Sequence, residues 1–309
     1  MPISKQIMLG CAAALAAAIA LPVLAQPAAA PLLAYTPKPI KLPGYGRNKP
    51  ITHLSEVLAK HKGQSSWTEQ VIKTGRFDTR WVQMAPGEKL STRYYGDDRV
   101  MWVVWQGQIR FNIEGQEPFV ASKGFLVQVP QRVRYSMETV GDAPALRFEV
   151  RPNGETPSHP IAETPDPVKG VKFVKATYTG RGKYDDINKP YVDFEKDIVA
   201  KNGKGGGAVK DDHTWANIIR QQGIPTPPAD NFGHFHENFA EFWLIMEGKE
   251  DFLIEGVPLI TAEFGDIVFA PEERWHRATA AGTGMGTRLA ITPRPPSIHY
   301  SQPEHSGGD

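Results

Sequence analysis

Two segments of the chain repeat each other at a constant offset of 141 residues, as between Trp102 and Trp243. Residues 99–115 align with residues 240–256, and the alignment continues without a gap to a matching glycine and proline. The identical pairs include Trp102 and Trp243, Gly107 and Gly248, Phe111 and Phe252, Ile113 and Ile254, Glu114 and Glu255, Gly115 and Gly256, Gly124 and Gly265, and Pro130 and Pro271. Self-similarity at a fixed period indicates one structural module built twice. We therefore expect two copies of one domain.

Both copies are rich in short apolar and β-branched runs that end in glycine, proline or aspartate-rich turns. The clearest runs are 100–105, 124–129, 146–150, 242–246 and 266–270. Short strands at regular spacing are typical of a sandwich or barrel rather than a parallel sheet. Helices are expected only over 53–62 and 191–201, where the apolar residues have helical spacing. The glycine-rich stretch 203–207 is expected to be a flexible connector.

Three histidines and one glutamate in the second copy have the composition of a metal site. His234 and His236 are two residues apart, so on a strand both side chains point to the same face. Glu241 follows after room for a turn, and His276 comes from a distant segment. Imidazole nitrogen and carboxylate oxygen together suit divalent metals. A His-x-His pair alone is more often an ordinary strand or loop pair, so this interpretation depends on all four residues.

These residues resemble the two sequence motifs of the cupin superfamily. The first motif, His-x-His, four residues, Glu, six residues and Gly, spans 234–248. The second, Gly, five residues, Pro, four residues and His, spans 265–276. The resemblance places the metal ligands of the family on His234, His236, Glu241 and His276. It implies a bicupin, a two-domain cupin, with both motifs in the C-terminal copy.

The chain departs from the family pattern at two positions. Glu273 stands where the family often has glycine, and Ala280 where it often has asparagine. Both positions shape a turn or a neighbouring strand rather than the ligand set. The resemblance thus implies an all-β fold of two double-stranded β-helix (jelly-roll) barrels with few short helices. It also implies one divalent metal ion per chain, either iron, manganese, copper or zinc.

The first copy lacks this ligand set. At the offset of 141 residues, Val100 replaces the glutamate and Tyr135 replaces the last histidine. If the loop keeps its length, Arg93 and Tyr95 replace the first two histidines. Of these side chains only tyrosine is a metal ligand, so we expect the first copy to be metal-free. Its role is then structural, or its arginine and tyrosines form a separate small-molecule pocket.

Residues 1–25 are expected to be a signal peptide. Lys5 precedes a nearly continuous apolar run over 7–24, and a small residue, Ala25, suits cleavage. An uncleaved membrane anchor is the alternative. The expected location is the periplasm or the outside of the cell. The single cysteine, Cys11, lies in this segment, so disulfides and thiolate ligands play no part in the rest of the chain.

The remaining boundaries follow from the repeat. We expect an extended arm and helix over 26–65, an N-terminal cupin over 66–155, a linker and helix over 156–208, a C-terminal cupin over 209–300 and a tail over 301–309. With 35 basic and 34 acidic residues, the chain has no charge excess suited to nucleic acid or an anionic membrane. A small molecule is the expected partner, and the extended arm and barrel edges favour a homodimer.

Four protein ligands leave about two positions open on an octahedral ion, for water, dioxygen or an oxygen-bearing substrate. The main prediction is an exported, dioxygenase-like oxidoreductase that acts on a small oxygenated or aromatic compound. The alternatives are a non-redox lyase, decarboxylase or isomerase, and a non-catalytic protein that binds a metal or small ligand. The candidate catalytic residues are Glu241, Glu273, Arg220 and Arg288. Trp243 and Ile245 share the strand face of Glu241 and should line the site, whereas Trp275 should point outward.

No organic cofactor is expected, because no glycine-rich phosphate loop follows a strand. No nucleophile motif supports a Ser-His-Asp site either.

Overall fold

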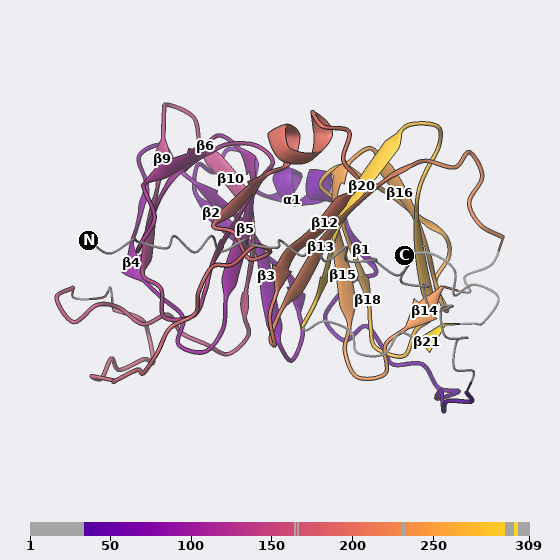
Figure 1. The fold of residues 1–309 in the computed structure, drawn as a ribbon, viewed down its shortest axis with the longest axis horizontal. Coiled ribbons are helices and arrows are strands. Elements are labelled where there is room, and N and C mark those ends of the chain that lie inside the picture. Colours follow the sequence, from indigo (N-terminus) through magenta and orange to yellow (C-terminus); the bar gives the residue numbers. More distant parts are fainter. Residues whose placement is uncertain (1–33, 164, 166, 230–232, 294–299, 302–309) are drawn as a thin grey trace, which may run out of the picture. The chain divides into compact units, whose positions relative to one another are not determined.

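The computed structural model describes residues 34–163, 165, 167–229, 233–293 and 300–301, and strands dominate it (Figure 1). The expected signal peptide and nearly all of the expected tail lie outside the described residues. The described residues from Thr36 onward form one unit, in which two successive halves of the chain build two barrels. The described helices are all too short to cross a membrane. The predicted all-β class with few short helices is confirmed.

Barrel 1 is built mainly from the first half of the chain. Its strands are β2 (Trp67–Lys73), β3 (Phe77–Met84), β4 (Lys89–Arg93), β5 (Val100–Gln106), β6 (Gln108–Ile113), β7 (Phe119–Ala121), β8 (Phe125–Val129), β9 (Tyr135–Val140), β10 (Ala145–Pro152) and β11 (Tyr191–Asp193). One sheet has the order β11-β8-β5-β10-β3-β2 and the other β4-β9-β6-β7. The predicted runs 100–105, 124–129 and 146–150 correspond to β5, β8 and β10.

Barrel 2 repeats this plan in the second half. Its strands are β1 (Ile51–Thr52), β12 (Gly205–Lys210), β13 (Trp215–Gln222), β14 (His234–Phe235), β15 (Glu241–Glu247), β16 (Lys249–Ile254), β17 (Ile260–Glu263), β18 (Ile267–Ala270), β19 (His276–Ala280), β20 (Met285–Thr292) and β21 (Tyr300–Ser301). One sheet has the order β1-β18-β15-β20-β13-β12 and the other β17-β16-β19-β14-β21. The predicted runs 242–246 and 266–270 correspond to β15 and β18.

Alternate side chains along a strand point to two different cores, the interior of the strand's own barrel and a core between the two barrels. On β5, Trp102 faces the interior of barrel 1, whereas Met101 and Val103 join a cluster shared by both barrels. The shared cluster joins residues from both halves, as where the rings of Phe77 and Phe242 meet at 5.7 Å. Burial of this apolar surface holds the two barrels together.

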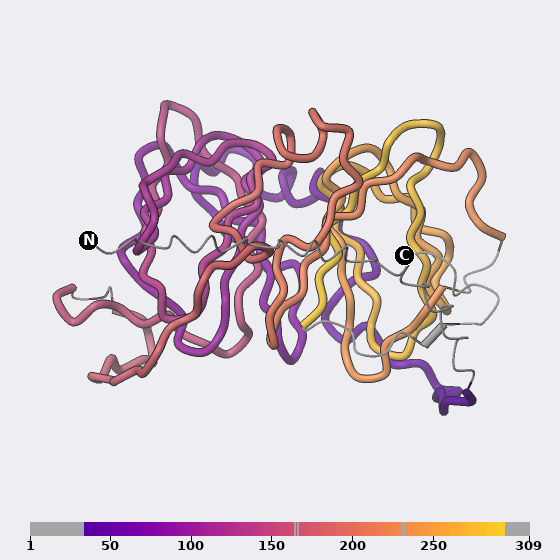
Figure 2. Tube along the Cα trace, viewed as in Figure 1, coloured from indigo at the N-terminus to yellow at the C-terminus, as the bar shows by residue number. Residues whose placement is uncertain are grey.

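Each barrel is completed by a strand from outside its own half. β1, which precedes barrel 1 in the sequence, pairs with β18 of barrel 2. β11, which precedes barrel 2, pairs with β8 of barrel 1. The first of these crossings can be followed in Figure 2, where the indigo segment that contains β1 runs beside the orange and yellow strands of barrel 2. Each barrel therefore depends on the other half of the chain for an edge strand.

Two short helices follow the crossing strands. α1 (Leu54–Lys60) confirms the helix expected over 53–62, and its Leu54 and Val57 are buried in the shared core. The stretch 191–201 differs from the prediction, because it begins as β11 and continues as a π-helix, η1 (Phe194–Val199). Asp193 caps η1 by accepting a hydrogen bond from the backbone N–H of Lys196. Pairing with β8 thus overrides helical spacing at the start of this segment.

The flexible connector expected over 203–207 is wrong, because residues from Gly205 onward form β12, which pairs with β13. The backbone explains why this strand is rich in glycine. A Cβ on Gly205 would lie 2.1 Å from the carbonyl oxygen of Ile218, and the residue has a positive φ of 93°. Glycine therefore allows a close approach of two strands here rather than a mobile linker.

Candidate metal centre

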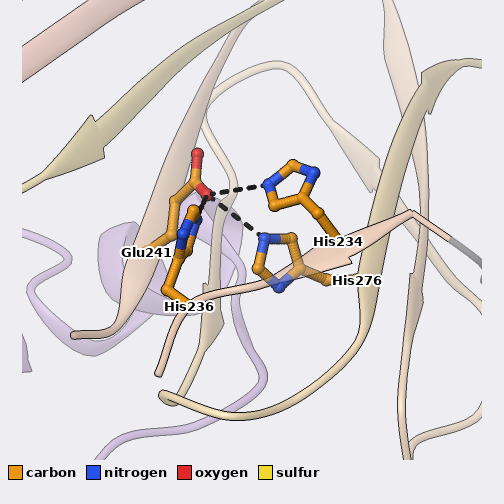
Figure 3. A group of neighbouring side chains, drawn as sticks. All are labelled: His234, His236, Glu241 and His276. Atoms are coloured by element: carbon orange, nitrogen blue, oxygen red, sulfur yellow. Dashed lines mark hydrogen bonds and ion pairs between the residues drawn. The ribbon is translucent and has the colours of Figure 1, made fainter. Parts of the chain in front are cut away.

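Two paired strands of one sheet of barrel 2 and one strand of its other sheet bring the predicted ligands together (Figure 3). His234 on β14 lies directly opposite His276 on β19 in the antiparallel pair. Glu241 begins β15, and His236 follows β14 by one residue. One ligand atom from each of the four side chains lies within 4.8 Å of the other three. Pairing of β14 with β19 thus brings the two sequence motifs together, although they are far apart in the chain.

The three imidazoles converge on a single oxygen of Glu241. The Nε2 atoms of His236, His276 and His234 lie 2.9, 3.2 and 3.8 Å from Glu241 Oε2. All four donor atoms therefore surround one small volume. Such a set of nitrogens and one carboxylate oxygen matches the ligand preferences of zinc, iron, copper and manganese. The donor set fits a divalent metal ion.

A second contact fixes the orientation of His276. Its Nδ1 lies 2.9 Å from the carbonyl oxygen of Arg274, so Nδ1 carries the proton and donates it. In the neutral ring, Nε2 then presents a lone pair toward Glu241 Oε2, which is itself an acceptor. Two facing acceptors require a cation or an added proton between them. A backbone acceptor behind a histidine is the usual outer support of a metal ligand.

Burial and charge act in opposite directions on Glu241. Desolvation by burial raises the pKa of its carboxyl group, but the three surrounding histidines, when protonated, outweigh this and hold that pKa well below its usual value. The carboxylate is therefore ionised inside the barrel. The side chains of His236 and His276 are 1% and 3% exposed, whereas His234 is 22% exposed. The site thus opens toward solvent on the side of His234.

Aromatic side chains form the walls next to the cluster. Phe239 stacks on His236 with ring centroids 4.5 Å apart, and the edge of Trp243 meets His276 at 5.3 Å. Trp243 and Ile245 lie in the inner cluster of barrel 2, as their spacing from Glu241 predicted. Trp275 packs instead against Phe235, at 4.9 Å. These aromatic rings cover part of the His236 and His276 side chains.

A cleft of about 600 Å³ has Phe239 in its lining. It is lined by the arm around Tyr45, the β2–β3 turn at Arg76, and the loops that carry Asn238 and Glu272. Its lining includes Phe239 but none of the four predicted ligands. Phe239, which stacks on His236, is thus shared by the cleft and the surroundings of the cluster.

Glu273 contributes through its backbone. It has a left-handed φ of 63° and donates its N–H to the carbonyl oxygen of His236 at 2.6 Å. Arg132, its counterpart in barrel 1, has the same φ and donates to Tyr95 at 2.8 Å. The turn thus helps to position His236, the second histidine of the His-x-His pair, through its backbone carbonyl. A left-handed turn also explains why the cupin sequence motif often has glycine at this position.

Replacing Glu273 by glycine is expected to stabilise the fold by about 0.5–1 kcal/mol, because glycine adopts a positive φ without a steric penalty. Metal content should be unchanged, since the backbone hydrogen bond to His236 is kept. Urea unfolding and metal analysis of the purified variant would measure both. A variant that loses its metal or its activity would assign the Glu273 side chain a direct role in the site.

The other two candidates have partners elsewhere. Arg220 makes two hydrogen bonds to Glu247, at 2.7 and 3.2 Å, and a third to Asn202 at 3.0 Å. This arginine ties β13 to the end of β15 and to the loop after η1. Arg288 is buried in barrel 2 and donates to Glu250 at 3.1 Å. Neither hydrogen-bond set involves the four predicted ligands.

Glu250 is a buried acid that the sequence analysis missed. It is completely buried, and burial raises its pKa to about 7, although Arg288 opposes this shift. β16 pairs with β19 so that Glu250 lies opposite Ala280 and Ile254 opposite His276. Four residues along a strand correspond to roughly 13 Å, so Glu250 lies toward the other end of the barrel. Glu250, Phe252 and Ile254 are alternate residues of β16, so their side chains point to the same face. This alternation is the feature of the sequence from which an inward-facing Glu250 could have been predicted.

Glu250 should make folding less favourable as pH rises. Its folded-state pKa of about 7 is above the ordinary value of 4.5, so the folded protein keeps this proton longer than the unfolded chain. The stabilisation is complete below pH 4.5 and is lost as pH rises through 7, by about 3 kcal/mol. Glu250→Gln should remove this component, and exposed Glu117→Gln should not. Urea unfolding at several pH values between 4 and 8.5 tests this, and equal slopes for all three proteins would contradict it.

The corresponding end of barrel 1 has the same register without the ligands. Arg93 lies opposite Tyr135 on β4 and β9, as His234 lies opposite His276. Tyr95 and Tyr135 are buried, and Val100 faces the same interior. The expected correspondence between the two copies therefore holds in the strand pairing.

No protein family model matches this chain, and no curated protein matches it in sequence. Among solved structures it is similar to a cupin 2 conserved barrel domain protein from Leptotrichia buccalis. That match has a TM-score of 0.50 and 11% identity, and it covers 79% of this chain and 96% of the other. Oxalate decarboxylase from Bacillus subtilis at pH 4.6 matches with a TM-score of 0.47 and 12% identity, over 82% of this chain and 78% of that one.

Identity this low describes the fold and not the reaction. The match to the Leptotrichia barrel protein over 79% of this chain nevertheless supports a cupin barrel fold. The chain therefore has the cupin fold, built as two barrels with a potential metal site of three histidines and one glutamate in the second.

Proposed function

We propose that this protein is a metal-dependent cupin enzyme with one metal ion, bound in barrel 2 by His234, His236, Glu241 and His276. We further propose that it is a dioxygenase-like oxidoreductase acting on a small oxygenated or aromatic compound. The observation that carries the proposal is the convergence of three Nε2 atoms on one ionised carboxylate oxygen inside the barrel. A buried cluster of this kind costs free energy to assemble unless a cation occupies it.

The protein's own residues have separable roles in this proposal. Glu241 supplies the negative charge, and the Arg274 carbonyl holds the His276 ring in the ligating tautomer. Phe239 and Trp243 keep water from the buried side, while the exposed edge of His234 marks the side of approach for a substrate. When bound, a redox-active metal would bring substrate and dioxygen together, and any divalent metal would polarise a substrate oxygen.

The contacts of the candidate acid–base residues favour oxidation over non-redox chemistry. A lyase, decarboxylase or isomerase commonly needs a positioned proton donor or acceptor beside the metal. Arg220 is engaged by Glu247, Arg288 by Glu250, and Glu273 acts through its backbone. The neighbouring walls are aromatic. Such surroundings suit a reaction in which the metal and dioxygen supply most of the chemistry.

Export is proposed from the sequence of residues 1–25. A chain that crosses the membrane unfolded acquires its metal outside the cytoplasm, where copper and zinc bind more strongly than iron or manganese. Metal analysis of protein purified from the periplasm therefore tests both location and metal. An equimolar metal content is expected. A metal-free protein that takes up no added divalent ion would remove the basis of the proposed function.

The reaction type is tested by oxygen-electrode measurements on the metal-loaded protein with a panel of aromatic diols and hydroxy acids. Dioxygen uptake that disappears in His276→Gln but persists in His213→Gln would support the proposal. His213 is a suitable control because it forms an ion pair with Asp98 away from the cluster. Turnover without dioxygen uptake would assign a lyase or isomerase instead. Binding without turnover would make the protein a metal or ligand carrier.

A further inference from the structure

The interior of barrel 1 carries charged residues on β10. Leu146, Phe148 and Val150 belong to the core shared by the two barrels. The alternate residues, Arg147, Glu149 and Arg151, must then face the inside of barrel 1 together with Ala145. Trp102, an inner residue, donates its Nε1–H to Glu149 at 2.8 Å, which agrees with this orientation. Barrel 1 is therefore not a purely apolar module.

Arg147 is the least satisfied of these residues. Its side chain is 4% exposed, and its described contact is a long one, 3.4 Å from Nη2 to Glu149 Oε2. Its Nε and Nη1 atoms are buried without a hydrogen-bond partner. Buried guanidinium N–H groups are nearly always paired, because leaving them unpaired costs free energy. These two donors therefore point to an acceptor that the chain itself does not supply.

The equivalent arginine in barrel 2 shows what kind of acceptor this is. Arg288, offset from Arg147 by 141 residues, pairs with the buried carboxylate of Glu250 at 3.1 Å. In barrel 1 the position of Glu250 is occupied by Ile109, which is fully buried and apolar. The arginine is thus kept in both copies, whereas a carboxylate at the position of Glu250 is present only in barrel 2. Arg147 has its long contact with Glu149 instead, where barrel 2 has Ala290.

The surrounding charges do not replace that carboxylate. Asp78 on β3 already pairs with Arg80 at 2.6 Å and with Arg151 at 2.7 Å. The inner faces of β3 and β10 thus carry three guanidinium groups, of Arg80, Arg147 and Arg151, and two carboxylates, of Asp78 and Glu149. One positive charge is left in excess. A bound monoanion would balance it.

We propose that barrel 1 binds a small planar monoanion, of the size of formate, acetate or nitrate, through the guanidinium group of Arg147. The anion takes the part that Glu250 plays in barrel 2. Trp102 and Val104 provide apolar walls, as inner residues of the same barrel. No metal ion is involved, so this site is chemically different from the His–Glu cluster. It gives barrel 1 a ligand of its own instead of a purely structural role.

The test uses a matched pair of substitutions at Ile109 in the full-length chain. Ile109→Glu supplies the missing carboxylate, whereas Ile109→Gln has nearly the same shape without the charge. Titration calorimetry with formate, acetate and nitrate should show one site in the wild type. Ile109→Glu should bind these anions at least about tenfold more weakly than Ile109→Gln, since its own carboxylate competes for Arg147. Equal affinities for the two variants would overturn the proposal.

Two further proteins separate this site from the metal centre. Arg147→Gln should lose anion binding by about tenfold or more, and exposed Arg110→Gln should retain it. His276→Ala, prepared with chelator, should bind the anions as the wild type does. Loss of binding in His276→Ala with retention in Arg147→Gln would place the anion at the His–Glu cluster and overturn the proposal. Binding of nitrate but not of acetate would identify an inorganic anion, and the reverse an organic carboxylate.

Discussion

Replacing Glu241 by glutamine is expected to lower the affinity for the metal ion by at least about 100-fold, since even outer-shell substitutions cost 10- to 100-fold. The two side chains have the same shape, so the change removes only the charge on which the three imidazoles converge. At a metal concentration 100 times the wild-type Kd, metal binding stabilises the wild type by about 2.7 kcal/mol. The same concentration should stabilise Glu241→Gln by about 0.4 kcal/mol or less.

Thermal unfolding with and without added metal, together with elemental analysis, measures this effect. Glu272→Gln is the matched control, because Glu272 is an exposed carboxylate in the loop that precedes His276. It should keep the metal and its stabilisation. If Glu241→Gln retained the metal at full affinity but lost activity, Glu241 would be a catalytic residue and not a ligand.

Replacing Gly248 by alanine is expected to destabilise the fold by about 3 kcal/mol. Gly248 ends the first sequence motif, between β15 and β16, and has a positive φ of 65°. A Cβ there would lie 2.1 Å from the carbonyl oxygen of Met285. That oxygen belongs to β20, whose backbone is held by pairing with β13 and β15. The sheet would have to shift to accept even one methyl group.

Gly282→Ala separates the two contributions to this cost. Gly282 has a similar positive φ of 72°, but a Cβ there meets nothing within 4 Å. Its expected cost is about 1 kcal/mol, from the backbone conformation alone. Urea unfolding would give the loss in free energy of unfolding for each variant. The difference between the two losses is the cost of the steric clash with β20. Equal costs at the two positions would show that the sheet yields and that the motif glycine serves only the turn.

Much of the fold could be predicted from local pattern. The runs that became β5, β8, β10, β15 and β18 are apolar and bounded by turn residues, and the period of the repeat identified two equivalent modules. The four predicted ligands were also recognisable, because their residue types and spacing are specific. The sequence did not show which strand each segment would pair with in the sheets. The glycines of β12 look like a linker until β13 is placed beside them.

Part of the candidate site was equally hidden. Arg220 and Arg288 carry the charge expected of substrate-binding residues, but their acceptors, Glu247 and Glu250, lie on other strands. Glu273 departs from the family pattern, yet the structure shows that its backbone still forms the turn. A single arginine or glutamate in a sequence carries no information about which residue faces it across a barrel.

The sequence by itself determined the repeated module, the strand-rich class and the set of residues capable of holding a metal, since these depend on residue type and short-range spacing. Only the tertiary structure decided that β1 completes barrel 2, that β11 completes barrel 1, and that three histidines meet one oxygen of Glu241. It also decided that Arg288 has a carboxylate partner and Arg147 has none at the matching position. Contacts between residues distant in sequence depend on strand pairing and on the burial of charge, which act over the whole folded chain.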